Sequence, residues 1–283
     1  MENKANADMD AYWNGEGGDK WVSFGDRLEA SLKPFGIRAI AAAALRGDEN
    51  VLEVGCGCGP NTIDLAKKLS GGQVRGLDIS ATVLEKARQD AAANKLSNIS
   101  FDCVDAQTGD LGVSQYDLAF SRFGVMFFDD PVRAFKNISG ALKPHGRITF
   151  ACWAAPGKNP WVAEPLALVA KHVPLPPPPE PGTPGPFSLS DEARLRDLLA
   201  EAGFINTAVE TFQASMVLGD GVAEAVEFLM NMAPSGGAVN RADPDAATRA
   251  AIATDLGDML KSCQGAKGVI MDAAALIVTA DKG

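Results

Sequence analysis

The fold of this chain is decided by one stretch, Val51-Leu52-Glu53-Val54-Gly55-Cys56-Gly57-Cys58-Gly59. Its first four residues are typical of a short buried strand. Pro60, directly after it, suits the first turn of a helix because its φ is fixed near the helical value. Glycines at alternate positions between them permit a sharp turn and let a ligand approach the main chain. The stretch therefore predicts a strand–turn–helix unit with a ligand-binding loop at residues 55–59.

Similar units follow along the chain. Further apolar runs are predicted to be strands, and segments with a helical apolar face separate them. Ser80 is expected to cap one helix, and Asp130 with Pro131 to begin another. Alternation at this pace predicts an α/β fold with a mostly parallel, doubly wound sheet covered by helices on both faces. The expected strands of this core are residues 51–54, 74–79, 99–104, 116–121 and 147–152.

Composition divides the chain into four parts. Residues 1–35 mix polar and aromatic residues and are predicted to form a lid segment of loop and short helix. Residues 36–172 form the ligand-binding core, beginning with a helix at 36–46. Residues 173–190 are predicted to be an extended loop, because the run 173–181 holds too many prolines for a helix or central strand. Residues 191–283 complete the sheet. This last part is expected to hold a helix capped by Ser190, a strand at 204–212, helices at 221–232 and 244–262 within a helical cover 219–262, and a closing strand at 274–280.

Charge and cysteine content exclude several function classes. The net charge is −10 over 283 residues, and no dense Lys/Arg run is present, which disfavours nucleic acid and anionic membrane surfaces as partners. No apolar run approaches the ~20 residues of a membrane span, and the first residues lack the apolar stretch of a signal peptide, so a cytoplasmic location is expected. The five cysteines include no second close Cys/His pair, so neither a disulfide framework nor a metal site is expected.

Acidic residues lie at or near the carboxyl ends of the first three predicted strands. Asp78 ends the second strand, 21 residues after Gly57, where a carboxylate can accept hydrogen bonds from both hydroxyls of a ribose. Asp105 follows the third strand, and Glu53 precedes the glycine loop. Because the carboxyl ends of parallel strands meet at one edge of the sheet, these three acids predict a nucleoside-binding site.

A nicotinamide-dependent oxidoreductase also carries a glycine loop and a following acid. Its G-x-G-x-x-G pattern would require glycine at the position of Pro60. A negative Glu53 would also repel a pyrophosphate, whereas it suits a ligand with a sulfonium and an α-ammonium group. Both observations favour a sulfonium nucleoside over a dinucleotide.

At these residues the sequence resembles the class I S-adenosylmethionine-dependent methyltransferases, most closely over residues 45–155. Residues 51–59 resemble their first motif, 76–80 the second, 103–106 the third, 116–119 the fourth strand and 142–147 the turn before the fifth. The subgroup is similar to small-molecule methyltransferases of quinone biosynthesis. The resemblance implies a seven-stranded sheet with an antiparallel last strand, at 274–280, and S-adenosyl-L-methionine as the cofactor.

The resemblance also implies roles for individual residues. The glycine loop would lie along the methionine part and the ribose of the cofactor, and Asp78 would bind the ribose hydroxyls. Asp105 would meet the adenine amino group, and Ser121 would approach the methionine part. The full set of expected cofactor-binding residues is Glu53, Gly55, Cys56, Gly57, Gly59, Asn61, Asp78, Ile79, Asp105, Ala106 and Ser121.

Aromatic residues outside these motifs are the candidates for the acceptor side. They suggest a small apolar or aromatic methyl acceptor, although the same residues could pack in the core or in a lid. In-line methyl transfer relies on positioning, so no catalytic residue is predicted beyond His172 as a weak candidate. A non-catalytic cofactor-binding protein remains the alternative, and the oligomeric state stays open. The expected pocket residues are Tyr12, Trp13, Trp21, Arg122, Phe123, Trp153 and Trp161.

Overall fold

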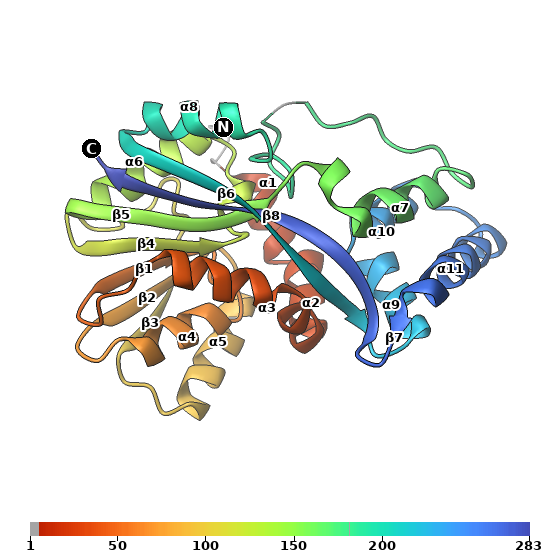
Figure 1. Ribbon diagram of the computed structural model, residues 1–283, viewed down its shortest axis with the longest axis horizontal. Helices are drawn as coiled ribbons and strands as arrows, with labels where there is room; N and C mark the ends of the chain where they lie inside the picture. Colours follow the sequence, from red (N-terminus) through yellow and green to blue (C-terminus); the bar gives the residue numbers. More distant parts are fainter. Residues whose placement is uncertain (1–5, 181) are drawn as a thin grey trace.

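The computed structural model describes residues 6–180 and 182–283, and its centre is a single twisted sheet (Figure 1). Its main strands lie in the order β3-β2-β1-β4-β5-β8-β6, with β8 antiparallel to both neighbours. A two-residue strand, β7, pairs with β8 off this path. The α/β fold with a mostly parallel sheet is thus confirmed. The strands are β1 (Asn50–Val54), β2 (Gln73–Asp78), β3 (Ile99–Cys103), β4 (Tyr116–Arg122), β5 (Leu142–Trp153), β6 (Phe204–Gly219), β7 (Gln264–Gly265) and β8 (Gly268–Lys282).

Helices pack on the sheet through apolar faces. As expected, Pro60 opens α4, the Ser80 side chain caps α5, and Asp130 caps α6. The last two caps satisfy backbone N–H groups that a helix start leaves free. The helices are α1 (Ala7–Trp13), α2 (Glu16–Ser23), α3 (Gly25–Ala42), α4 (Pro60–Lys68), α5 (Ala81–Ala93), α6 (Pro131–Ala141), α7 (Pro160–Val169), α8 (Glu192–Glu201), α9 (Val222–Asn231), α10 (Pro234–Ala242) and α11 (Ala246–Leu260), with short 3₁₀ turns at Val125–Phe127, Pro156–Lys158 and Lys261–Cys263.

The N-terminal part is more helical than predicted. The helix expected at 36–46 begins at Gly25 and ends at Ala42, and α1 and α2 precede it. Pro34 lies inside α3. Burial explains why α3 is helical despite this proline, since Leu28, Leu32 and Phe35 form an apolar stripe against the core. Residues 1–5 of the expected lid segment lie outside the described residues.

The C-terminal part differs from its prediction in three ways. The closing strand expected at 274–280 and the strand expected at 204–212 are both longer, because β6 and β8 pair as a long antiparallel ribbon that extends toward α9–α11 (Figure 1). Helix α10 was not expected, since its sequence contains two glycines; Ala238 and Val239 bury one side of it. Asp191, and not Ser190, caps α8, because its carboxylate accepts from two backbone amides while the Ser190 hydroxyl donates to the Phe187 carbonyl.

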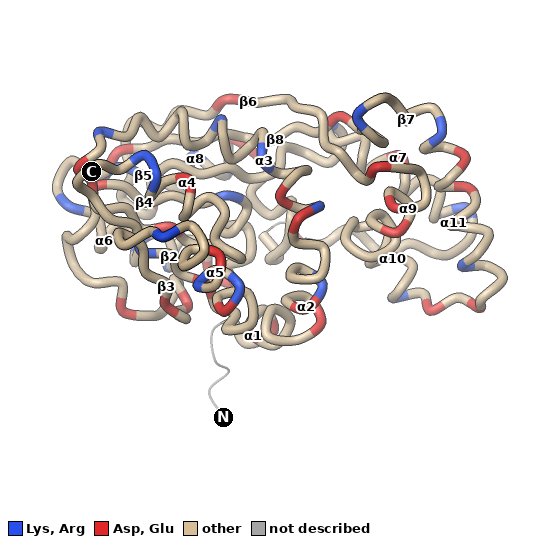
Figure 2. Tube along the Cα trace, turned by 90° about the horizontal axis from the view of Figure 1, so that it is seen from below, with Lys and Arg blue, Asp and Glu red and all other residues tan. Residues whose placement is uncertain are grey.

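The proline-rich segment connects the core to the C-terminal part. Residues 174–180 are neither helix nor strand, as expected, and Pro181 lies outside the described residues. Figures 1 and 2 show α7, α9, α10 and α11 gathered at one end of the molecule, away from β1–β3. No helix of the described residues is long and apolar enough to span a membrane.

Candidate functional site

The glycine loop between β1 and α4 takes a backbone form that only glycine adopts readily. Gly55, Gly57 and Gly59 have φ values of +66°, +55° and +80°. A Cβ atom on Gly55 would lie 2.7 Å from the Cα atom of Gly124, which belongs to the loop after β4. The loops at the ends of β1 and β4 therefore touch backbone to backbone, a contact that no larger residue would permit.

Asp78 at the end of β2 holds this loop in place. One carboxylate oxygen accepts a hydrogen bond from the Gly57 amide at 2.8 Å, and the other accepts from the Ser80 amide at 3.0 Å. Burial raises the pKa of Asp78, and the backbone amides oppose that rise. Each oxygen keeps a further lone pair, so the carboxylate can still accept from ligand hydroxyls.

Asp105, after β3, is tied to several neighbours. One oxygen accepts from the side-chain amide of Asn6 at 2.9 Å and from the backbone amide of Gln107 at 2.8 Å. The other accepts from the hydroxyl of Thr108 at 2.9 Å. Ala106 beside it is buried. The contact with Asn6 links the N-terminal segment to the end of β3.

Glu53 lies behind the loop, fully buried. The Thr62 hydroxyl donates to one of its oxygens at 2.5 Å, and the other oxygen has no hydrogen-bond partner among the described residues. Burial raises the pKa of Glu53 to about 8. The expectation of a negative Glu53 is therefore corrected: near neutral pH the free protein holds this carboxyl mainly in its neutral form, because burial penalises the charge.

A cavity opens above the carboxyl ends of β1, β2 and β4, where open α/β sheets bind ligands. Its empty space, counted together with the part open to solvent at its mouth, is about 770 Å³. Its walls combine carboxylates, bare loop backbone and aromatic rings. The lining residues are Asn6, Met9, Trp13, Trp21, Val54, Gly55, Gly57, Leu77, Asp78, Ile79, Val83, Val104, Asp105, Ala106, Arg122, Phe123, Gly124, Phe127 and Phe128.

The expected cofactor residues divide between this wall and the layer behind it. Gly55, Gly57, Asp78, Ile79, Asp105 and Ala106 line the cavity. The remaining five, Glu53, Cys56, Gly59, Asn61 and Ser121, are not part of its lining.

Two of those five, Cys56 and Asn61, line a second, adjoining groove. The buried Cys56 packs with Leu84, Ala87 and Phe101. The Ser121 hydroxyl accepts from the Gly124 amide at 3.2 Å and so steadies the loop after β4.

The expected acceptor residues divide in a similar way. Trp13, Trp21, Arg122 and Phe123 line the cavity, and the Trp13 ring packs edge-on against Phe127 at 5.4 Å between centroids. Tyr12 is 49% exposed and only borders Trp13.

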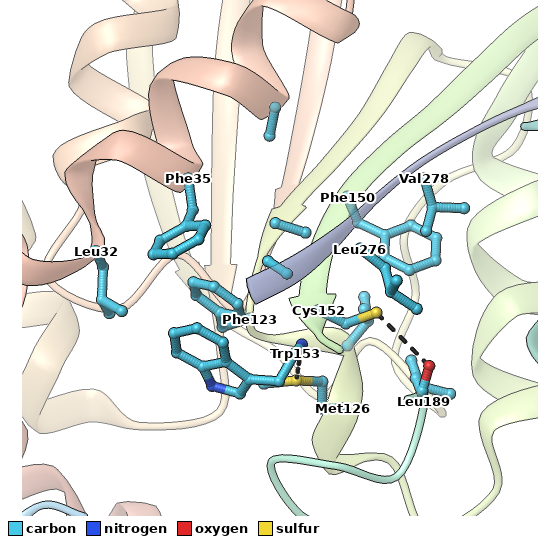
Figure 3. Close-up of a cluster of buried hydrophobic side chains, with 14 of the residues drawn as sticks. Leu32, Phe35, Phe123, Met126, Phe150, Cys152, Trp153, Leu189, Leu276 and Val278 are labelled. Carbon is cyan, nitrogen blue, oxygen red and sulfur yellow. Dashed lines mark hydrogen bonds between the residues drawn. The ribbon is translucent and has the colours of Figure 1, made fainter. Parts of the chain in front are cut away.

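Trp153 and Trp161 lie in the core. Phe123 stacks on Trp153 with ring centroids 4.2 Å apart, as Figure 3 shows. The two tryptophan rings are 5.1 Å apart, so Trp161 stands one layer further back. Phe123 itself has a φ of +61°, a form that non-glycine residues seldom take. The aromatic contacts around it hold the loop after β4 in this shape.

A second, more polar groove adjoins the cavity. It lies between α2–α3, the glycine loop and the start of α9, and Trp21, Gly55, Gly57 and Arg122 line both hollows. Arg122 is nearly buried and pairs with Glu29 at 2.8 Å.

Arg27 joins the two sides of the groove. It reaches from α3 to Glu227 of α9 at 3.1 Å. His172 lines neither hollow, and its ring contacts Asp255 of α11 at 2.8 Å. Within the described residues, no group of three or more His, Cys, Asp or Glu side chains could hold a metal ion.

Several lining residues were not predicted. Gly124 could have been found, since a glycine directly after the fourth strand suits close contact with the first loop. Asn6 gave no signal, because it stands among polar residues far from every motif.

Comparison with known proteins identifies the domain. Residues 51–146 match a family model described as a methyltransferase domain. The chain is similar to aklanonic acid methyltransferase DauC of Streptomyces sp. (strain C5), with 34% identity over 134 residues, 47% of this chain and 61% of that protein. It is also similar to the ubiquinone biosynthesis O-methyltransferase of Coxiella burnetii, with 28% identity over 120 residues, 42% of this chain and 50% of that protein. The chain thus spans 61% and 50% of these relatives' lengths.

A solved structure agrees in fold. The phosphoethanolamine N-methyltransferase 2 of Haemonchus contortus, in complex with S-adenosyl-L-methionine, aligns with a TM-score of 0.60 and 16% identity over 99% of this chain and 60% of that one. Residues 51–146 therefore form a methyltransferase domain, and this match, together with the similarity of the chain to a named methyltransferase, supports S-adenosylmethionine as its cofactor.

Proposed function

We propose that this protein transfers a methyl group from S-adenosylmethionine to a small apolar or aromatic molecule. The observation that carries this proposal is one cavity with two kinds of wall. Asp78, Asp105 and the backbone of Gly55 and Gly57 line it together with the rings of Trp13, Trp21 and Phe123. The first set suits a nucleoside with a charged tail, and the second suits a flat apolar acceptor.

The cavity fits the cofactor in its chemistry. Gly55 and Gly57 bring backbone without a side chain to the cavity lining, and a Cβ atom on Gly57 would lie 3.2 Å from the indole nitrogen of Trp21. The Asp78 carboxylate would accept from the ribose hydroxyls, Ile79 would pack on the adenine ring and Asp105 would accept from its amino group. Glu53, Gly59 and Ser121 would support these contacts from behind, and Cys56 and Asn61 would contribute from the adjoining groove. When bound, S-adenosylmethionine supplies an activated methyl group on a sulfonium.

The protein's own contribution is to hold the acceptor close and to exclude water. Orientation of this kind can supply roughly 7–11 kcal/mol of the barrier. Arg122 ends β4 and Phe123 follows it, so both would face the acceptor beside the glycine loop. We propose that α1 and α2 act as its lid and that 219–262 act as its cover. Trp153 and Trp161 would affect the acceptor only indirectly, through Phe123. Tyr12 and His172 line neither hollow, so they would have no direct role in acceptor binding.

The partner class follows from the surface. Figure 2 shows acidic and basic residues interspersed along the chain, and the net charge is −10. Nucleic acid binding needs clustered positive charge, so we propose a small-molecule acceptor and a protein that works in the cytoplasm.

Calorimetry and a methyl-transfer assay test the proposal together. Wild-type protein should bind S-adenosylhomocysteine and should transfer radiolabelled methyl to members of a panel of phenols, quinols and polyketides. Binding of NADH without binding of S-adenosylhomocysteine would reverse the assignment to an oxidoreductase. Binding without transfer to any apolar acceptor would support the non-catalytic alternative, and transfer only to strongly charged acceptors would refute the proposed acceptor class.

A further inference from the structure

Asn6 is an unusual beginning for a helix. It stands at the N-cap of α1 with a left-handed backbone, φ 56° and ψ 21°, and its side chain makes no capping bond. Asparagine is among the best N-caps because its side chain satisfies free helix amides. Here the side chain has different partners, and the residue is 6% exposed.

One of those partners, Asp105, lines the cavity. The Asn6 side-chain amide donates to Asp105 at 2.9 Å, and its carbonyl oxygen accepts from the Asp129 backbone amide at 2.8 Å. Gln107 parallels this arrangement: its backbone amide donates to Asp105, and its side-chain oxygen accepts from the Asp130 amide at 2.9 Å. Asn6 therefore clamps the loop after β3 to the loop before α6.

The hydrogen-bond capacity of Asp105 leaves room for a ligand. A carboxylate offers about four lone-pair sites. Asn6, Gln107 and Thr108 fill three of them, two on one oxygen and one on the other. One site is left on the oxygen bonded to Thr108, so an adenine amino group can bind without displacing Asn6.

Asn14 provides a second attachment of the same segment. Its side chain donates to the Ile79 carbonyl at 3.1 Å and accepts from the Ala81 amide at 3.0 Å. Between the two asparagines, Met9 and Trp13 line the cavity. Asn6 and Asn14 thus hold the two ends of α1 over the cavity, but only Asn6 touches the expected adenine acceptor.

We propose that Asn6 is a positioning residue for adenine recognition, which fixes the Asp105 carboxylate so that its free lone pair faces the adenine amino group. This inference rests on the proposed function, because it takes S-adenosylmethionine as the ligand. It links attachment of the N-terminal segment to recognition of the adenine base, because the Asn6 end of the lid is held by Asp105, the same carboxylate that would bind the adenine amino group. Asn14 attaches the lid without reading the base.

The experiment compares S-adenosylhomocysteine with its hypoxanthine analogue, S-inosylhomocysteine, by calorimetry. Wild type should prefer the adenine ligand about tenfold or more, since the hypoxanthine oxygen leaves Asp105 without its donor. Asn6→Gly removes the side chain but allows the left-handed backbone; it should reduce that preference at least threefold. Asn14→Ala is the matched control, expected to weaken both ligands alike and to leave their ratio unchanged.

The outcomes separate the two levels of inference. An unchanged ratio in folded Asn6→Gly, or an equal loss of ratio in Asn14→Ala, would overturn the role of Asn6. If Asn6→Gly does not fold, Asn6→Gln provides the same test, because its longer amide displaces the donor from Asp105 and should also lower the ratio. If wild type binds neither ligand, the proposed function itself is refuted, and the positioning role with it.

Discussion

The buried carboxyl of Glu53 makes stability depend on pH in a direction opposite to that of most acidic residues. Unfolded, the group loses its proton near its ordinary pKa of 4.5; folded, it keeps the proton up to about pH 8. The folded state therefore binds more protons between these values, and the free energy of unfolding falls as pH rises through that window. The limiting slope is about 1.4 kcal/mol per pH unit, or roughly 3 kcal/mol between pH 5 and 7.5.

Urea unfolding, followed by tryptophan fluorescence at several pH values, measures this effect. Glu53→Gln keeps the shape of the side chain but cannot titrate, so the stability difference between wild type and variant isolates Glu53. Groups whose pKa shift does not involve Glu53, such as Glu49, whose pKa is lowered, contribute to both proteins alike. We expect wild type to lose its advantage over the variant as pH rises. A difference that stays constant from pH 5 to 7.5 would show that Glu53 is ionised in the free protein.

Three further substitutions test the site and its support. Asp78→Ala should weaken S-adenosylhomocysteine binding at least tenfold by calorimetry, and should lower Tm by a few degrees because the Gly57 amide loses its acceptor. Gly55→Ala should cost about 2 kcal/mol or more in urea unfolding, since a Cβ would lie 2.7 Å from Gly124; unchanged stability would contradict the backbone contact. Trp153→Ala should lower the free energy of unfolding by about 3–5 kcal/mol, because it leaves a cavity in the core. The loss would be measured as a lower urea midpoint, and an unchanged midpoint would contradict the burial of Trp153.

Much of the core could be predicted because its signals are local. Apolar runs, caps and turn residues lie next to each other in the sequence, and they located β1–β4 to within about two residues. The strand expected at 147–152 proved to begin at Leu142, where pairing with β4 is irregular between Tyr116 and Leu118. The full length of the β6–β8 pair could not be predicted, because its outer half is stabilised by pairing between residues far apart in the sequence.

The site was predictable to the same extent. The glycine loop, Asp78 and Asp105 carry their chemistry in their spacing, so their place at one sheet edge could be inferred. The burial of Glu53 and of Trp153 depends on what packs over them, which single residues do not reveal. Asn6 is the clearest case: only the folded chain brings it to Asp105, 99 positions further along.

The backbone contact between Gly55 and Gly124 makes the two halves of the cavity one mechanical unit. A ligand that shifts the glycine loop must also shift the loop after β4, and through Phe123 it presses on the aromatic layer of Trp153. Coupling between the two sites is reciprocal: if the first ligand raises the affinity for the second, the second must raise the affinity for the first by the same factor. The contact between this pair of glycines thus gives the protein a route to cooperative binding of its two ligands.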